Sequence, residues 1–205
     1  LLAILDSLQA AQEKLAWSNT YTLAIADSAR ALLNAVDPDS TPMSESEILQ
    51  HMGTVAYYNA EADLGAELLN ALVASGGLAD IENPVLRARL AGLAATFSEA
   101  VSYQRLDQDF THNRQYRFWQ THANINQIFN TLSDWPGHPG EAHPKPDIAS
   151  GEELDYTPLL NNREWRNLLA LRVARLGDLS YVGYPALELA LADTIAAISE
   201  ELERL

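Results

Sequence analysis

The feature that most constrains this chain is the recurrence of apolar residues at alternating steps of three and four. Residues 1–36 and 84–132 carry this spacing over most of their length, which is typical of a helix that buries one face. We predict that these are the two longest helices. Shorter helices are predicted for 44–53 and 55–74, and a last helical region starts at Asn161 or Asn162. No segment alternates in the manner of a strand, so the predicted fold class is all-α.

Residues at helix ends support this division. Ser44 and Glu47 have the spacing of a capping box, and Gly53 predicts the end of the helix that they start. Gly76 predicts a left-handed C-cap, because glycine adopts positive φ without a steric penalty. Pro185 predicts a kink or break in the last helical region, since proline donates no backbone hydrogen bond.

Residues 134–158 differ in composition from the rest of the chain. They hold five of the nine prolines and three of the ten glycines, so we predict a loop with little regular structure. Each long amphipathic helix needs a partner for its apolar face. We therefore predict one helical-bundle domain over residues 1–205, a bundle of long antiparallel helices with a proline-rich loop at 134–158.

Composition excludes several classes of function. The 205 residues hold 28 acids and 13 lysines and arginines, so the net charge is −15, and we expect no nucleic-acid partner. Cysteine is absent, which excludes disulfides and thiolate chemistry. The phosphate loops GxxxxGK[ST] and GxGxxG and the nucleophile motif GxSxG are also absent. We assign no catalytic residue and expect no cofactor.

Two carboxylate–histidine pairs have helical spacing. Glu47 and His51 are four residues apart, and Asp109 and His112 are three apart, so each pair shares a helix face. Such a pair could contribute to a metal site, but the chain has no ExxH motif of the kind that di-iron bundles use. Ordinary surface or capping polarity explains both pairs, and we predict no metal site.

Polar residues interrupt the apolar stripe of the segment 84–132 at its centre. Gln104, Gln108, Thr111 and Gln115 occupy stripe positions, and a buried polar group without partners is costly. These side chains therefore either face water in a partly open cleft or face polar groups such as those of residues 18–22. We favour the hydrated cleft.

The same segment, residues 103–122, combines aromatic side chains with arginines. Stacking and charge-assisted hydrogen bonds make such a combination suitable for a polar ligand pocket. The alternative is a solvated helix face on which the arginine stems lie along the surface. The candidate ligand-binding residues are Tyr103, Arg105, Asp109, His112, Tyr116, Arg117 and Trp119.

Two stretches have distinctive patterns. The second is the run LNNREWRNLL at 160–169, and the first consists of Ser75, Gly76, Leu78, Ile81, Asn83, Leu86, Arg87 and Leu90. Within the first, Asn83-Pro84 predicts a helix start. The two stretches resemble the signatures of a family of uncharacterised bacterial membrane-anchored proteins. The resemblance implies one N-terminal transmembrane helix followed by a helical domain on the periplasmic side of the inner membrane. It implies that an anchor upstream of Leu1 has been removed. It transfers no activity, and the proline-rich segment departs from the family pattern.

Three functions follow as expectations. The first is a non-enzymatic extracytoplasmic domain that binds a small ligand or a partner protein. The second is a structural or scaffolding protein of the envelope. The third is a metal-dependent enzyme that uses Asp109 and His112. No feature of the sequence sets an oligomeric state.

Overall fold

The computed structural model describes residues 1–37, 39, 41–57, 64–130 and 154–204. Every regular element in these ranges is helical, which confirms the predicted all-α fold. The chain divides into two compact units, one formed by Leu1–Thr22, Ala60–Leu106 and Gly177–Leu205, the other by Leu23–Asn59 and Asp107–Leu176. The prediction of a single domain stays a prediction.

The α-helices, in chain order, are α1 (Leu2–Asn34), α2 (Glu45–Tyr57), α3 (Glu67–Ala74), α4 (Pro84–Phe110), α5 (Tyr116–His122), α6 (Ile125–Asn130), α7 (Thr157–Leu160), α8 (Arg163–Asp178) and α9 (Tyr184–Leu202). Three further elements are the 3-10 helix η1 (Gly77–Asp80) and the π-helices η2 (Thr111–Gln115) and η3 (Leu179–Gly183).

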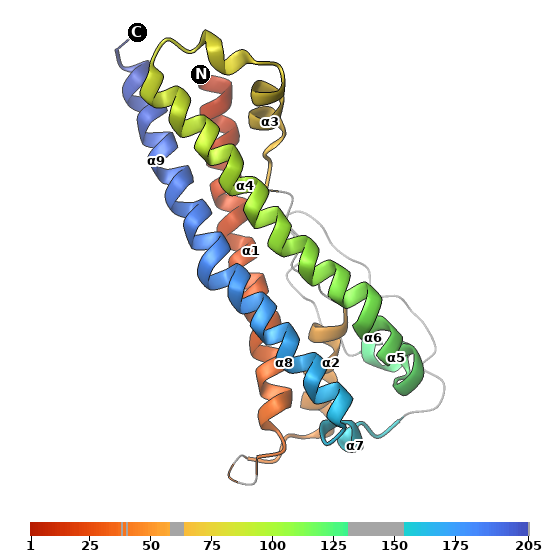
Figure 1. Cartoon of the computed structure of the whole chain (residues 1–205). Helices are drawn as coiled ribbons and strands as arrows, with labels where there is room; N and C mark the ends of the chain where they lie inside the picture. Colours follow the sequence, from red (N-terminus) through yellow and green to blue (C-terminus); the bar gives the residue numbers. More distant parts are fainter. Residues whose placement is uncertain (38, 40, 58–63, 131–153, 205) are drawn as a thin grey trace. The chain divides into compact units, whose positions relative to one another are not determined.

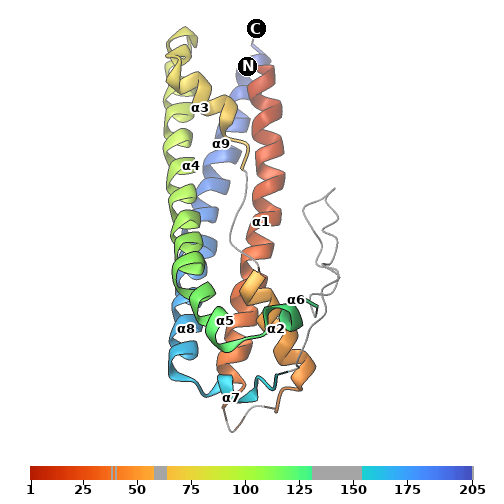
Figure 2. The same ribbon diagram turned by 90° about the vertical axis from the view of Figure 1, so that its right-hand side faces the viewer.

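In the first unit, α4 and α9 run antiparallel. Three hydrogen bonds join them along their length, from Asn83 to the Glu201 carboxylate (2.8 Å), from Arg89 to the Asp193 carbonyl (2.7 Å) and from Gln104 to the Tyr184 hydroxyl (3.0 Å). Residue numbers rise along α4 while they fall along α9, as an antiparallel pair requires. The first part of α1 lies beside α9 and runs in the same direction as α4 (Figures 1 and 2).

The second unit is built around a hydrophobic core that is rich in aromatic side chains. Phe118 stacks on Trp165 with ring centroids 5.3 Å apart, and Trp119 meets Trp165 edge to face at 4.5 Å. Helix α2 packs against α6 and contributes Met52, which is completely buried. Aromatic pairs in these geometries stabilise a core beyond the area they bury.

Four predicted helix ends are confirmed. The Ser44 N–H donates to the Glu47 carboxylate at 2.7 Å and the Glu47 N–H donates to Ser44 Oγ at 3.3 Å, which is a complete capping box before α2. Gly76 has φ of 75°, in the left-handed region. The Asn83 side chain accepts hydrogen bonds from the first turn of α4 at 3.0 and 3.2 Å, and the Asn162 side chain does the same for α8 at 3.0 Å.

The predicted boundary between the second and third helices is wrong. Gly53 does not end α2, which continues through it to Tyr57, and the next helix starts at Glu67 and not at Val55. Gly65 has φ of 68°, and a residue with positive φ does not fit a right-handed helix. The predicted helix from Val55 to Ala74 is therefore interrupted at Gly65, and α3 starts after it. Residues 58–63 lie outside the described part of the chain.

The predicted helix over 84–132 is divided. Helix α4 continues through η2 into α5, which ends at His122, and α6 starts at Ile125. The Asn124 side chain accepts a hydrogen bond from Gln127 N–H at 3.3 Å and so caps α6. The backbone N–H of Asn124 donates to the Tyr156 hydroxyl at 2.8 Å. The last residues of the predicted helix lie outside the described ranges.

Each π-helix lies where the buried stripe takes successive steps of four. Buried residues recur at 107, 111, 115 and 119, and again at 172, 176, 180 and 184. In a regular α-helix three such steps would rotate the stripe by about 120°. A π-turn holds one extra residue, with a bond from Tyr116 N–H to the Thr111 carbonyl and another from Tyr184 N–H to the Leu179 carbonyl. The extra residue keeps the stripe on the buried face.

The π-helix η3 directly precedes Pro185, where we predict a kink or break. The helix does not break there and runs from Arg163 to Leu202, 40 residues, through η3. It is longer than α1, which has 33 residues, and so is the helix that continues from Pro84 through η2 to His122. Residues 1–36 are therefore not one of the two longest helices. The π-turn ends directly before the first turn of α9, where proline is tolerated because its missing N–H needs no partner.

Within the described ranges, Arg163–Leu202 is the one helix whose length and composition would allow it to cross a membrane, with a mean hydropathy of 1.2 over its most apolar 18 residues, of which 33% are buried. A core helix meets the same criterion, and the side chains of Leu187, Leu191 and Ile198 are completely buried. Of the predicted proline-rich loop, residues 134–153 lie outside the described part. Its last two residues, Thr157 and Pro158, begin α7 instead.

We predict opposite effects from one substitution at two glycines. Gly76→Ala forces alanine to positive φ and should lower the free energy of unfolding by about 1 kcal/mol. Gly92→Ala, in the exposed interior of α4, should raise it by about 0.5–1 kcal/mol. A Cβ at either glycine meets no atom within 4 Å, so conformation alone separates the two. Urea unfolding measures both, and equal effects would contradict the assignment of the cap.

We also predict that acid destabilises the protein through His51. Partial burial lowers the pKa of His51 from 6.5, although Glu47 nearby opposes the shift. A group with a lowered folded-state pKa contributes stability above its unfolded value and loses it as the pH falls. The melting temperature of the wild type should therefore fall more steeply below pH 6.5 than that of His51→Gln. Parallel curves for the two proteins would refute the prediction.

Candidate functional site

The most constrained polar group in the second unit is the guanidinium of Arg172. This side chain from α8 is completely buried, and its acidic partner Asp107 is 1% exposed. Nη2 lies 3.4 Å from Asp107 Oδ2, and Nη1 donates to Gln115 Oε1 at 2.9 Å and to the Val55 carbonyl. Gln115 Nε2 also donates to that carbonyl, at 2.6 Å.

Helix geometry explains why the Val55 carbonyl accepts two hydrogen bonds. Val55 lies in the last turn of α2 (Glu45–Tyr57), and carbonyls at this end of a helix are available to side-chain donors. The C-terminal end of a helix also carries partial negative charge that favours a cation. Arg172 and Gln115 therefore cap α2 from the interior, and Asp107 balances the buried charge.

This cluster overturns the predicted hydrated cleft. Gln104, Thr111 and Gln115 are all buried, so the prediction that this stripe faces water is wrong for these three. Gln104 and Gln115 bond to Tyr184, Arg172 and the Val55 carbonyl, and these partners lie outside the residues 18–22 that were the predicted candidates. The hydroxyl of Ser18 donates within its own helix, to the Lys14 carbonyl at 2.8 Å.

A groove of about 1020 Å³ lies in the second unit, between η2–α5 and the start of α8. Its lining from the first side is Asn113, Arg114, Arg117, Phe118, Thr121 and His122. Its lining from α8 is Arg163, Glu164, Asn167, Leu168 and Leu171. The groove thus combines an apolar base with a polar and charged rim.

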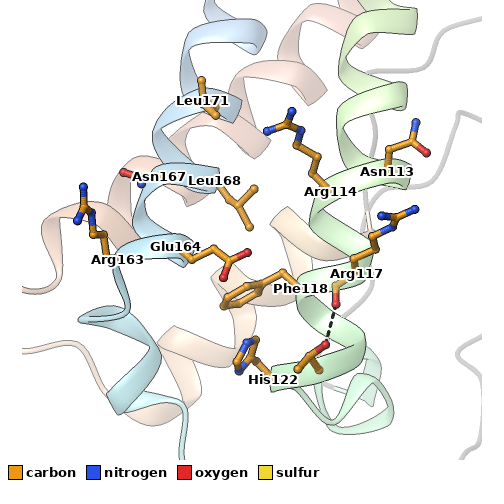
Figure 3. A pocket seen from close by; sticks show the side chains of 11 residues that line it. Asn113, Arg114, Arg117, Phe118, His122, Arg163, Glu164, Asn167, Leu168 and Leu171 are labelled. Carbon is orange, nitrogen blue, oxygen red and sulfur yellow. Dashed lines mark hydrogen bonds between the residues drawn. The ribbon is translucent and has the colours of Figure 1, made fainter.

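Two oppositely charged side chains enter the groove from its two sides (Figure 3). Arg114 points from η2 toward α8, and Glu164 points from α8 toward α5. The side chains of Arg117 and Arg163 are directed away from the space between the helices. No ion pair is formed by Arg114 or Glu164 with another described residue.

The base of the groove is apolar and well supported. Phe118 is 3% exposed and Leu168 is 8% exposed, and the centroid of the Phe118 ring lies 5.3 Å from that of Trp165 and 4.5 Å from that of His122. Leu171 extends this surface and is 45% exposed. A ligand in the groove would therefore find an uncovered leucine beside an apolar base that is almost fully buried.

The seven candidate ligand-binding residues have different surroundings in the structure. Arg117 alone is among the residues that line the groove. His112 and Tyr116 meet edge to face at 5.2 Å, and the Tyr103 ring packs against Gly183, where an added Cβ would lie 3.1 Å from Cδ2. Of the other candidates, Arg105 and Asp109 are exposed and Trp119 is completely buried, so the candidate ligand site stays a prediction.

Sequence reasoning missed most of the groove. Arg114, Phe118 and His122 recur at steps of four within the segment 103–122, and Glu164, Leu168 and Leu171 recur at steps of four and three. Each set has the spacing of one helix face. The two faces meet only in the tertiary structure, which the spacing does not reveal.

The two carboxylate–histidine pairs do not converge with further ligands. Among the described residues, no group of three or more histidine and acidic side chains could hold a metal ion. His112 is exposed, and its Nδ1 lies 2.9 Å from the Gln108 carbonyl of its own helix. The Ser44 side chain and backbone hydrogen bonds lower the pKa of Glu47, which fits a capping role.

We predict that Arg172→Met destabilises the protein by about 3–5 kcal/mol, because it leaves the Asp107 carboxylate buried without its cation. The double variant Arg172→Met/Asp107→Leu should recover part of this loss, since it removes the uncompensated charge as well. Urea unfolding of the two variants tests the pair. A double variant that is no more stable than the single one would contradict the role of Asp107 as counterion.

Comparison with protein-family models, with curated proteins and with solved structures gives no match to this chain. The resemblance to a membrane-anchored family therefore stays a prediction.

Proposed function

We propose that this chain is a non-enzymatic binding domain whose groove between α5 and α8 takes a small organic ligand with an anionic group. The observation that supports the proposal is the combination of Arg114, which forms no ion pair with another described residue, and the apolar base formed by Phe118 and Leu168. Ligand pockets typically pair a largely apolar lining with a few polar groups that fix orientation. The same groove could take the terminus of a partner protein.

The distribution of charge favours the groove as a place where an anion binds. The protein has a net charge of −15, so an anion is repelled by most of its surface. Arg114 points into the groove, whereas Arg117 and Arg163 line it with their side chains directed away. An anion that the acidic surface repels therefore meets one inward-pointing arginine in this groove.

The alternative functions receive less support. A scaffolding role would need a surface that pairs with another chain. The apolar base and charged rim of the groove do not favour that role over ligand binding. The alternative enzyme would need Asp109 and His112 to act together with a further ligand, and both side chains are exposed without one among the described residues.

A titration tests the binding site. Isothermal titration calorimetry with N-acetyl-leucylphenylalanine, an apolar molecule with one carboxylate, should show binding to the wild type. Arg114→Gln should weaken it about tenfold, because a charge-assisted hydrogen bond is lost. Arg105→Gln, an equal change of charge on an exposed arginine outside the groove, should leave the affinity unchanged. No binding, or equal loss in both variants, would refute the proposal.

The location in the bacterial envelope is part of the proposal and is supported only by the resemblance of residues 75–90 and 160–169. We propose that an N-terminal membrane anchor holds the domain on the periplasmic side of the inner membrane. Fractionation of cells that express the full-length protein tests this location. Recovery in the soluble cytoplasmic fraction would overturn it without affecting the ligand proposal.

A further inference from the structure

We infer that the groove recognises a zwitterion, specifically a short apolar peptide with both termini free. The inference rests on the proposed function and names the class of ligand. Arg114 would receive the terminal carboxylate and Glu164 the terminal ammonium. The apolar side chains would lie on Phe118, Leu168 and Leu171.

The first argument is the opposition of two charges. Arg114 and Glu164 enter the groove from facing helices (Figure 3) and form no ion pair with each other or with another described residue. A ligand with a single negative charge would be attracted by Arg114 and repelled by Glu164. A ligand that carries both charges satisfies both side chains, so electrostatic complementarity selects the zwitterion.

The second argument is the position of Glu164 within its helix. It lies in the first turn of α8, where the helix dipole favours a negative charge. Because Arg117 and Arg163 point away from the groove, no second cation enters from either wall to neutralise this carboxylate. Glu164 is therefore placed to bind a cationic group of a ligand.

The third argument is size and surface. A volume of about 1020 Å³ is at the upper end of the range that holds drug-sized molecules, so one free amino acid would fill only part of it. The exposed Leu171 offers apolar contact in the groove, beside the nearly buried side chains of Phe118 and Leu168. A short peptide with apolar side chains matches this arrangement.

Three probes test the inference by calorimetry with the whole chain: leucylphenylalanine with free termini, its N-acetyl form and its C-terminal amide. The free dipeptide should bind at least tenfold more tightly than either blocked form. Glu164→Gln should weaken binding of the free dipeptide about tenfold and should leave the N-acetyl form equal or stronger. Arg114→Gln should weaken the free dipeptide and leave the amide unchanged.

Glu99→Gln is the matched control, because Glu99 is exposed on α4 and does not line the groove. It should leave the affinity for all three probes unchanged. If Glu164→Gln binds the free dipeptide as tightly as the wild type or more tightly, the zwitterion inference is overturned. Binding of the N-acetyl form through Arg114 would then still support the proposed function, whereas no binding of any probe would refute both.

Discussion

The second unit depends on the burial of one guanidinium. An ionised side chain that leaves water loses several kcal/mol of solvation, so Arg172 is tolerated only because fixed partners surround it. These partners come from different parts of the chain: the Asp107 carboxylate on α4, the Gln115 amide on η2 and the Val55 carbonyl at the end of α2. Three elements are thereby held at one point of α8, and each must keep its register for the charge to remain balanced.

The groove lies on the same elements as this buried cluster. Gln115 faces the interior from η2, and Arg114, its neighbour in sequence, faces the groove. On α8, Arg172 is buried one residue after Leu171, which lines the groove. The interactions that fix the interior faces of η2 and α8 therefore also fix the exposed faces that line the groove.

The sequence was sufficient for the fold class and for several helix ends, because those depend on local chemistry. The capping box at Ser44, the cap at Asn83 and the left-handed Gly76 each act over a few residues. The sequence was insufficient where two positions carry the same local signal. Gly53 and Gly65 look equally able to end a helix, and only the folded chain gives Gly65 positive φ.

The site was harder to predict for a related reason. Asp107 and Arg172 both occupy stripe positions, and a charged residue at such a position usually marks the edge of a buried face. Their burial depends on a partner that is 65 residues away in the chain, which no helical periodicity reports. The segment 103–122 contributes to both features: Gln115 belongs to the buried cluster around Arg172, and Arg114 and Phe118 line the groove.

The π-helix η2 accommodates one residue more than a regular α-helix would hold between α4 and α5. Deletion of one residue from Thr111–Gln115 would allow a regular α-helix to form there, and the side chains of α5 would keep their directions because the π-turn already absorbs the extra residue. Insertion of one further residue would instead turn every following side chain of α5 by about 100° around the helix axis, and Phe118 would leave the groove. The groove therefore tolerates the loss of one residue from this short segment better than the gain of one.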